Sequence, residues 1–328
     1  MTGRVVVLGL GGTIAMTAGA GGGGVVPALS AEQLVAAVPG LAATGITVDV
    51  VDFRRVPGAS LSFADIRSVA AAVEQHLAGG ADGVVVTQGT DTIEETAYLL
   101  DLTHTRDEPL VVTGAMRNPT LAGADGPANI LAAVQTAASR AARGLGAVVV
   151  FADEIHAAAR VRKTHTTSGH TFQSANGGPL GYVVEGTPRI VNEPRTRVTV
   201  PAVGDKPVEV AVVPVVLGDN GTVLEAVADR VDGLVVAAFG VGHVPESVVD
   251  ILSGLAERMP VVLASRTGSG SVLERTYAFP GSESDLLGRG LIPAGFLDPL
   301  KARILLWHLL SNGHDIADIR QTFARNDP

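Results

Sequence analysis

The stretch Val84-Val85-Val86-Thr87-Gln88-Gly89-Thr90-Asp91-Thr92-Ile93-Glu94-Glu95-Thr96 joins an apolar run to a turn of small and polar residues. This order predicts a buried strand that turns into a helix. In an open α/β sheet, such a corner lies at the carboxyl end of a strand and the amino end of a helix, where backbone N–H groups bind anions. One interpretation is structural, with Asp91 and Glu94 forming a capping box. The other gives Thr90 and Asp91 a chemical role.

A second corner of the same kind opens the chain, where Val5-Val6-Val7-Leu8 leads into Gly9-Leu10-Gly11-Gly12-Thr13-Ile14-Ala15. A dinucleotide site is disfavoured, because its fingerprint needs a third glycine where Ile14 stands. After Met16 the chain passes through glycines 19 and 21–24, which predicts a flexible loop. A mobile loop beside a hydroxyl nucleophile is typical of a gated active site, and a surface linker without a role is the alternative.

A third segment, Arg160-Val161-Arg162-Lys163-Thr164-His165-Thr166-Thr167-Ser168, places one lysine among short hydroxyl side chains. Alone it is typical of a solvated basic turn. Together with two Gly-Thr corners it suggests a relay of threonine, lysine and aspartate, because a threonine hydroxyl is a poor nucleophile until a neighbouring base takes its proton.

These segments resemble the bacterial-type L-asparaginases, a family of threonine amidohydrolases, and the matching motifs occur in the family's order over nearly the full length. They are Gly11-Gly12-Thr13-Ile14-Ala15, Gln88-Gly89-Thr90-Asp91-Thr92-Ile93-Glu94-Glu95-Thr96, Thr113-Gly114-Ala115-Met116-Arg117, Ala124-Asp125-Gly126-Pro127-Ala128-Asn129, Lys163-Thr164-His165-Thr166-Thr167 and Lys301-Ala302-Arg303. The resemblance implies hydrolysis of L-asparagine to L-aspartate and ammonia, without a metal or other cofactor.

By position, the resemblance makes Thr13 the nucleophile that attacks the side-chain amide, with Thr90, Asp91 and Lys163 assisting. Asp91 also contacts the substrate's α-amino group, Gln88 and Gly89 border the substrate, and the backbone N–H of Thr90 faces the developing oxyanion. Ammonia leaves first, and water then hydrolyses the acyl-enzyme ester. A broader glutaminase-asparaginase and an asparagine-binding sensor without turnover are the alternatives.

The chain departs from the family pattern in places. Gln88 replaces the usual histidine before Gly-Thr-Asp, and no tyrosine lies between Met16 and Glu32, where the family's loop carries one. The serine that holds the substrate carboxylate is assigned to Ser60, but Gly58 takes that position if Ser62 is the N-cap of the following helix.

In the family, a neighbouring subunit completes each active site, which implies a homo-oligomer, either dimer or tetramer. The matching partner-contributed residues are Glu283, against the substrate α-amino group, and His243 in the Gly240-Val241-Gly242-His243 loop. A solvated loop glutamate and a plain loop histidine are the alternatives. His165 and His170 do not predict a metal site, because a spacing of five does not place two ligands on one helical face.

Composition agrees with an enzyme of small-molecule substrates. The 328 residues carry a net charge of −9, which argues against nucleic acid and anionic membranes as partners. There is no cysteine, so disulfides and cysteine-based zinc sites are excluded. The chain enters its first strand without an apolar signal segment and has no ~20-residue apolar span. We therefore expect a cytoplasmic protein.

Strand and helix patterns alternate along the chain, which predicts an α/β fold with two mostly parallel sheets flanked by helices, of asparaginase-like, Rossmann- or flavodoxin-like architecture. Expected strands cover 46–51, 83–87, 109–112, 147–151, 209–216, 233–238 and 260–264; expected helices cover 30–38, 62–78, 92–102, 125–142, 222–230, 245–257 and 298–311. Clustered prolines predict a linker at 190–208, between a catalytic domain at 1–189 and a smaller domain at 209–328.

Overall fold

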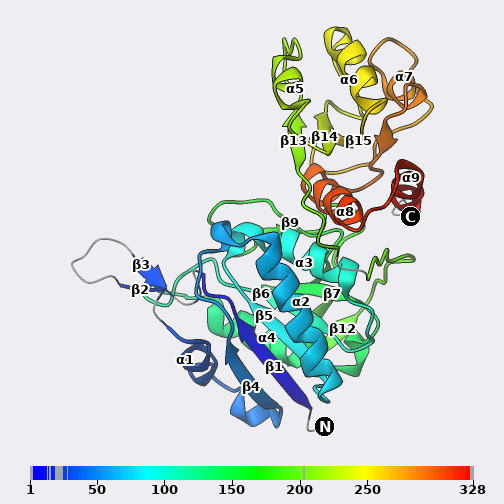
Figure 1. Cartoon of the computed structure of the whole chain (residues 1–328). Helices are drawn as coiled ribbons and strands as arrows, with labels where there is room; N and C mark the ends of the chain where they lie inside the picture. The colour runs from blue at the N-terminus through cyan, green and yellow to red at the C-terminus, as the bar shows by residue number, and fades with distance from the viewer. Residues whose placement is uncertain are drawn as a thin grey trace. The chain divides into compact units, whose positions relative to one another are not determined.

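The computed structural model describes residues 3–12, 14, 16–18, 25–27, 29–201 and 204–325. The chain divides into two compact units, Met1–Pro194 and Arg195–Pro328 (Figure 1). Within the described ranges, no helix combines the length and the apolar character needed to span a bilayer.

The first unit is built on an eight-stranded sheet with the order β12-β11-β8-β7-β6-β5-β1-β4. Its parallel part is β4-β1-β5-β6-β7, and β8, β11 and β12 extend it in antiparallel pairs. The strands are β1 Arg4–Gly9, β4 Thr47–Asp52, β5 Gly83–Thr87, β6 Leu110–Thr113, β7 Ala147–Phe151, β8 Glu154–Ala157, β11 Gly181–Val184 and β12 Thr187–Ile190. The residues of β5, β6 and β7 are buried throughout, as expected of strands covered on both faces.

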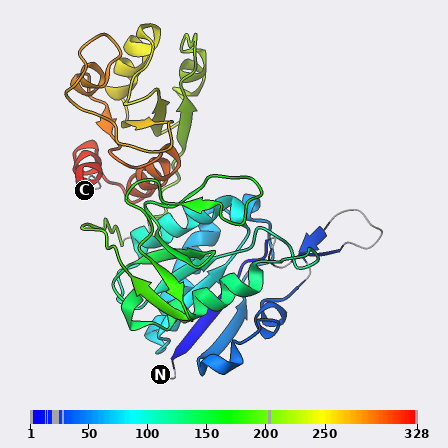
Figure 2. The same ribbon diagram turned by 180° about the vertical axis from the view of Figure 1, so that it is seen from behind.

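Helices cover both faces of this sheet (Figures 1 and 2). One face carries α2 Phe63–Ala78 and α3 Ile93–Thr103, which pack against each other, and the opposite face carries α1 Ala31–Ala36 and α4 Gly126–Ala137. Two small antiparallel hairpins lie outside the sheet: β2 Met16–Ala18 with β3 Val25–Pro27, and β9 Arg162–Lys163 with β10 Phe172–Gln173. This layering leaves the carboxyl ends of β1 and β5 side by side at one edge.

The second unit has a parallel four-stranded sheet with the order β13-β14-β15-β16. Its strands are β13 Val210–Pro214, β14 Gly233–Ala238, β15 Val261–Ser265 and β16 Ile292–Pro293; its helices are α5 Thr222–Val227, α6 Val249–Ala256, α7 Glu283–Gly288, α8 Pro299–Ser311 and α9 Ile316–Arg325. The long helix α8 packs along β13, β14 and β15. Buried aliphatic side chains of β14, β15 and α6 form the core.

The predicted α/β class, with mostly parallel sheets flanked by helices, is confirmed. The helix expected at 125–142 is wrong in its length: α4 ends at Ala137, and a separate 3-10 turn follows at Arg140–Ala142 because Ser139 caps it by accepting from Ala141 N. The loop expected after Met16 contains the β2–β3 hairpin, and glycines 19 and 21–24 lie outside the described residues.

Three glycine backbones meet where β1 and β5 end. A Cβ atom on Gly12 would lie 2.1 Å from Gly89 N, and one on Gly58 would lie 2.8 Å from Gly89 O. Gly12 also has a φ of +87°, which favours glycine. Because no side chain fits between them, these contacts hold three separate segments of the chain at one point: the end of the β1 corner, the turn after β4 and the β5 corner.

We expect Gly12→Ala to cost at least about 3 kcal/mol of unfolding free energy, since it adds a backbone clash to the strain of a positive φ. Gly40→Ala is the matched control, because Gly40 has a φ of +79° but nothing within 4 Å of its Cβ position. It should cost about 1 kcal/mol. Urea unfolding measures both, and equal losses would contradict the close packing at Gly12.

His156 is a buried titratable group of the antiparallel extension. Its side chain is 1% exposed, and its Nδ1 lies 3.0 Å from Ser174 Oγ. Burial, and to a lesser extent the charge of His170, lowers the pKa of His156 to about 4. Nε2 lies 3.3 Å from a Glu154 oxygen, a contact that is an ion pair only when the ring is protonated. With a pKa of about 4, the ring is neutral at pH 7.

Because the folded pKa of about 4 lies below the ordinary value of 6.5, the unfolded chain binds more protons between these two values. The stability that neutral His156 contributes is therefore complete above pH 6.5 and lost as the pH falls towards 4, by about 3 kcal/mol. His156→Gln should flatten the stability–pH curve between pH 7 and pH 4.5 by about 2 kcal/mol, as measured by urea unfolding at these two pH values. An unchanged curve would show that the ring titrates normally in the folded protein.

Candidate active site

The strand-to-helix corner after β5 carries the first group of predicted site residues. Gly89 ends the strand in extended conformation, Thr90–Thr92 form a 3-10 turn, and α3 follows at once. Lys163 Nζ lies 2.9 Å from Thr90 Oγ1 and 3.0 Å from Asp91 Oδ1. The structure therefore brings Thr90, Asp91 and Lys163 together, with a hydroxyl and a carboxylate both in contact with one lysine amine.

The capping-box interpretation of Asp91 and Glu94 is wrong. The residue at the N-cap of α3 is Thr92, and it makes no side-chain capping bond. Asp91 instead accepts from the ammonium of Lys163, and Glu94 Oε1 accepts from the Lys163 backbone N–H at 3.3 Å. Two carboxylates therefore hold one lysine, one at its head and one at its backbone.

The β9–β10 hairpin delivers Lys163 to this corner, with Lys163 paired to Phe172. Beyond the lysine, Thr164 N and Oγ1 both donate to Thr171 O, and His165 N donates to Thr171 Oγ1. His165 Nδ1 accepts from the backbone N–H groups of Thr167 and Ser168, at 3.0 Å each. The polar side chains of this segment thus stabilise the turn that carries the lysine.

Among the described residues, no three histidine or acidic side chains gather in a way that could hold a metal ion. His170 lies 3.4 Å from a Glu154 oxygen, at the rim of the same hairpin.

Gln88 and the turn after β4 lie on the other side of the corner. The Gln88 side chain is fully buried, and its Nε2 donates to Gly89 O at 3.3 Å and to Thr92 Oγ1 at 3.2 Å. Thr92 Oγ1 in turn donates to Gly58 O at 3.0 Å. Gly58 is buried, whereas Ser60, two residues later in the same 3-10 turn, is exposed. Ser62 is the N-cap of α2, in a capping box with Asp65, so the condition that favours Gly58 over Ser60 at the aligned position is met. Gly58 has no hydroxyl, and a role for the exposed Ser60 stays a prediction. The Gln88 side chain bonds the corner on its buried side.

Thr13 lies outside the described residues, but both of its chain neighbours in the described part are well anchored. Gly12 packs against Gly89, and the buried Ile14 packs against Gly126 at the start of α4. Leu10 N donates to Thr87 O, which extends the pairing of β1 and β5 past the strand ends. The corner that contains Thr13 therefore borders the corner that contains Thr90.

Asp125 and Asn129 explain two of the sequence motifs. Asp125 accepts from the backbone N–H groups of Met116 and Arg117, and Asn129 Nδ2 donates to Gly114 O at 3.0 Å. Asn129 Oδ1 also accepts from Ala152 N. These bonds fix the segment after β6 against α4, next to the β1 and β5 corners.

His243 and Glu283 form a pair within the second unit. Glu283 is 0% exposed; one of its oxygens accepts from the backbone N–H groups of Thr276 and Tyr277, and the other lies 3.1 Å from His243 Nε2. Burial alone raises the pKa of Glu283, but these hydrogen bonds outweigh it and hold the pKa below its ordinary value. His243 is 24% exposed and packs edge-on against Tyr277 and Phe279. His243, not Glu283, thus reaches the surface of the unit, and substrate contact by either stays a prediction.

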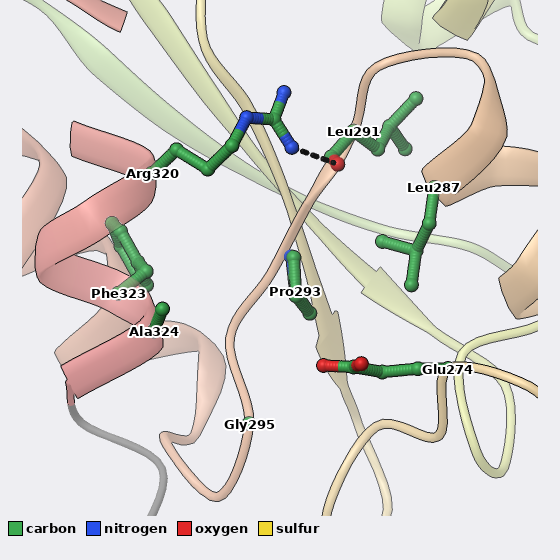
Figure 3. Close-up of a pocket in the computed structure, with 8 residues that line it drawn as sticks. All are labelled: Glu274, Leu287, Leu291, Pro293, Gly295, Arg320, Phe323 and Ala324. Carbon is green, nitrogen blue, oxygen red and sulfur yellow. Dashed lines mark hydrogen bonds between the residues drawn. The ribbon is translucent and has the colours of Figure 1, made fainter. Parts of the chain in front are cut away.

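A cavity of about 310 Å³ lies elsewhere in the second unit, between α7, β16 and α9 (Figure 3). Apolar side chains such as Leu287 and Phe323 form its walls, with Glu274 and Arg320 at its rim. Arg320 donates to the carbonyls of Gly290 and Leu291, which ties α9 to the turn that precedes β16. None of the predicted site residues lines this cavity.

Sequence reasoning missed two supporting residues, Glu94 and Thr92. Both belong to the quoted corner, and their roles depend on chain segments far away in sequence, Lys163 and Gly58 respectively. No local pattern in the sequence signals such contacts.

Comparisons with known proteins agree with this arrangement. The family described as "Asparaginase, N-terminal" matches residues 4–196, and "Glutaminase/Asparaginase C-terminal domain" matches residues 209–323. The "Probable L-asparaginase" of Deinococcus radiodurans is 36% identical over 327 residues, covering 98% of this chain and 97% of the relative. The "L-asparaginase 2" of Escherichia coli is 38% identical over 250 residues, covering 74% and 70% of the two chains.

A solved structure agrees as well. The crystal structure of a "Probable Cytoplasmic L-asparaginase" from Campylobacter jejuni superposes with a TM-score of 0.85 at 31% identity, covering 98% of this chain and 99% of that one. The motifs, the fold and these matches together show that the chain belongs to the asparaginase family.

Proposed function

We propose that this protein is an L-asparaginase that hydrolyses L-asparagine to L-aspartate and ammonia through an acyl-enzyme on Thr13. The observation that carries the proposal is the contact of Lys163 Nζ with both Thr90 Oγ1 and Asp91 Oδ1, beside the corner that contains Thr13. The family matches over both units support it, as does the agreement of relatives named as L-asparaginases.

The proposed reaction has two halves. The Thr13 hydroxyl attacks the side-chain amide carbon of asparagine, and its proton passes to the amide nitrogen, which leaves as ammonia. Lys163, held by Asp91, orients the Thr90 hydroxyl, which positions the water that attacks the ester. The backbone N–H of Thr90 stabilises the oxyanion in both halves. Hydrolysis of the ester releases aspartate and restores the Thr13 hydroxyl.

Substrate recognition in this proposal uses the charged ends of asparagine. Asp91 is 63% exposed at the corner, which leaves one carboxylate oxygen free to meet an ammonium group while the other contacts Lys163. Ser60 and the backbone of Gly89 border the substrate carboxylate, and Gln88 fixes the corner from below. Whether asparagine is preferred over glutamine depends on one methylene, which is worth ~1–3 kcal/mol in a pocket.

Variants of the two key side chains test this proposal. We expect Thr13→Ala to abolish ammonia release from L-asparagine, and Lys163→Met to lower kcat by a factor of about 10² to 10⁴, because it removes a proton-transfer group. Ammonia release from L-asparagine and L-glutamine should be measured side by side. Thr13→Ala with full turnover would refute the nucleophile, and a wild type inactive on both amides would favour a binding sensor.

We also propose a homo-oligomer, dimer or tetramer, in which His243 and Glu283 of one subunit complete the site of a neighbour. The exposed aromatic side chains Tyr277 and Phe279 around the His243–Glu283 pair support a covered surface at this place. The proposed domain boundaries are 1–189 and 209–328 with a linker between them.

Subunit complementation tests this assembly. We expect His243→Ala to raise the KM for asparagine, and co-expression with the inactive Thr13→Ala chain to restore turnover with the wild-type KM, since mixed sites then combine an intact Thr13 with an intact His243. A wild-type protein that sediments as a fully active monomer would contradict the shared site. Mixed assemblies that keep the raised KM would contradict the contribution of His243.

We further propose a cytoplasmic location, supported by the likeness to the Campylobacter jejuni structure described as cytoplasmic. Fractionation of the native cell tests it, because activity released with the periplasmic contents would place the enzyme outside the cytoplasm.

A further inference from the structure

A directed chain of hydrogen bonds links the corner of the proposed active site to the turn that carries Ser60. It runs from Gln88 Nε2 to Thr92 Oγ1 at 3.2 Å, and from Thr92 Oγ1 to Gly58 O at 3.0 Å. Thr92 belongs to the β5–α3 corner, and Gly58 to the turn after β4, 34 residues earlier. The contact therefore joins two of the three segments that meet at the glycines.

The donors and acceptors fix the direction of these two hydrogen bonds. Gly58 O is a carbonyl and only accepts, so the Thr92 hydroxyl donates to it. The hydroxyl proton is then used, so the amide of Gln88 must present its NH₂ group to Thr92 Oγ1. The same NH₂ group donates to Gly89 O at 3.3 Å, where an amide oxygen would be repelled. Gln88 is thus locked in one orientation.

This orientation of the Gln88 amide leaves its oxygen unpaired. Gln88 Oε1 is buried and has no hydrogen-bond partner among the described residues. A buried acceptor without a partner is costly, but the opposite flip would also leave Gly89 O and Thr92 Oγ1 without the donor that Gln88 now supplies. The two hydrogen bonds that Gln88 donates offset the cost of its unpaired oxygen. The Gln88–Thr92–Gly58 hydrogen bonds therefore constrain the corner and are not an incidental contact.

We propose that Thr92, oriented by Gln88, is a positioning residue that sets the distance between the Ser60 turn and the Thr90–Asp91 corner, and thereby the affinity for the substrate's α-carboxylate and α-amino groups. This inference rests on the proposed function, because Ser60 and Asp91 receive those groups only if the substrate is an amino acid amide. Thr92 itself does not belong to the relay: among the described residues, the hydrogen-bond partners of Lys163 include Thr90, Asp91 and Glu94.

The inference predicts a split between binding and chemistry. Thr92→Val keeps the shape of the side chain but removes its hydroxyl, and we expect it to raise the KM for asparagine and the Kd for aspartate about tenfold while kcat changes less than twofold. Thr92→Ser keeps the hydroxyl and should stay within twofold of wild type. Thr103→Val is the matched control, since its hydroxyl bonds back to Leu99 O and Leu100 O at the other end of the same helix.

A double-variant cycle tests the role of Gln88. Gln88→Met removes the amide but leaves Thr92 free to donate to Gly58, so we expect a smaller rise of about threefold in the aspartate Kd. In Gln88→Met/Thr92→Val the Kd should equal that of Thr92→Val alone, because the amide acts only through the hydroxyl. If the rise in Kd of the double variant equals the product of the two single rises, Gln88 does not act through the Thr92 hydroxyl, and the proposal is contradicted.

The measurements are steady-state kinetics with L-asparagine and calorimetric titration with L-aspartate, with far-UV circular dichroism to verify folding. If Thr92→Val is unfolded, Thr92→Ser and Gln88→Met still decide: a tenfold Kd rise in Thr92→Ser would overturn the proposal. A folded Thr92→Val with unchanged Kd and KM, or with a loss in kcat alone, would also overturn it. A wild type that binds aspartate but releases no ammonia refutes the proposed activity and leaves the Kd comparison intact.

Discussion

The contact of three glycine backbones is the constraint on which the proposed active site depends. Gly12, Gly58 and Gly89 come from the ends of different strand connections, and the missing Cβ atoms allow them to meet at distances that no other residue permits. The parallel sheet supplies the coarse placement, because β1 and β5 are neighbours in register. The glycines supply the final approach, which no sheet geometry alone provides.

Polar side chains then fix what the glycines bring together. Lys163 is held from two sides, by Asp91 at its ammonium and by Glu94 at its backbone N–H. Its side chain is 17% exposed while that of Asp91 is 63% exposed, so the lysine is shielded and the carboxylate faces solvent. The lysine ammonium is thus placed against an internal hydroxyl, and the Asp91 carboxylate is open to a charged ligand. Asp125 and Asn129 hold the segment after β6 against α4, next to this corner.

Much of this arrangement could be predicted from the sequence. Valine runs followed by glycine indicated the strands β1 and β5 and their corners, and the grouping of Thr90, Asp91 and Lys163 followed from a family resemblance whose motifs are strongly ordered along the chain. The parallel strands were predictable because buried runs such as Val84-Val85-Val86 leave few alternatives.

The parts that the sequence did not predict depend on long-range contacts. The short strands β8, β11 and β12 have only four residues each, and β11 and β12 alternate weakly between buried and exposed positions, so no periodicity marks them. Thr92 and Glu94 looked like ordinary residues of a helix start, because their partners Gly58 and Lys163 lie 34 and 69 residues away. The alternative of a solvated loop acid for Glu283 is wrong, because the backbone N–H groups of Thr276 and Tyr277 and the ring of His243 hold its carboxylate in a buried position.

The most direct test of the account is to locate the acyl group. The enzyme should be mixed with L-asparagine, quenched in acid within a turnover and digested, and the peptides analysed by mass spectrometry. The account predicts an aspartyl ester on Thr13, which accumulates further in Lys163→Met because the second half of the reaction is slowed. An ester on Thr90, or turnover without any covalent intermediate in either protein, would contradict it.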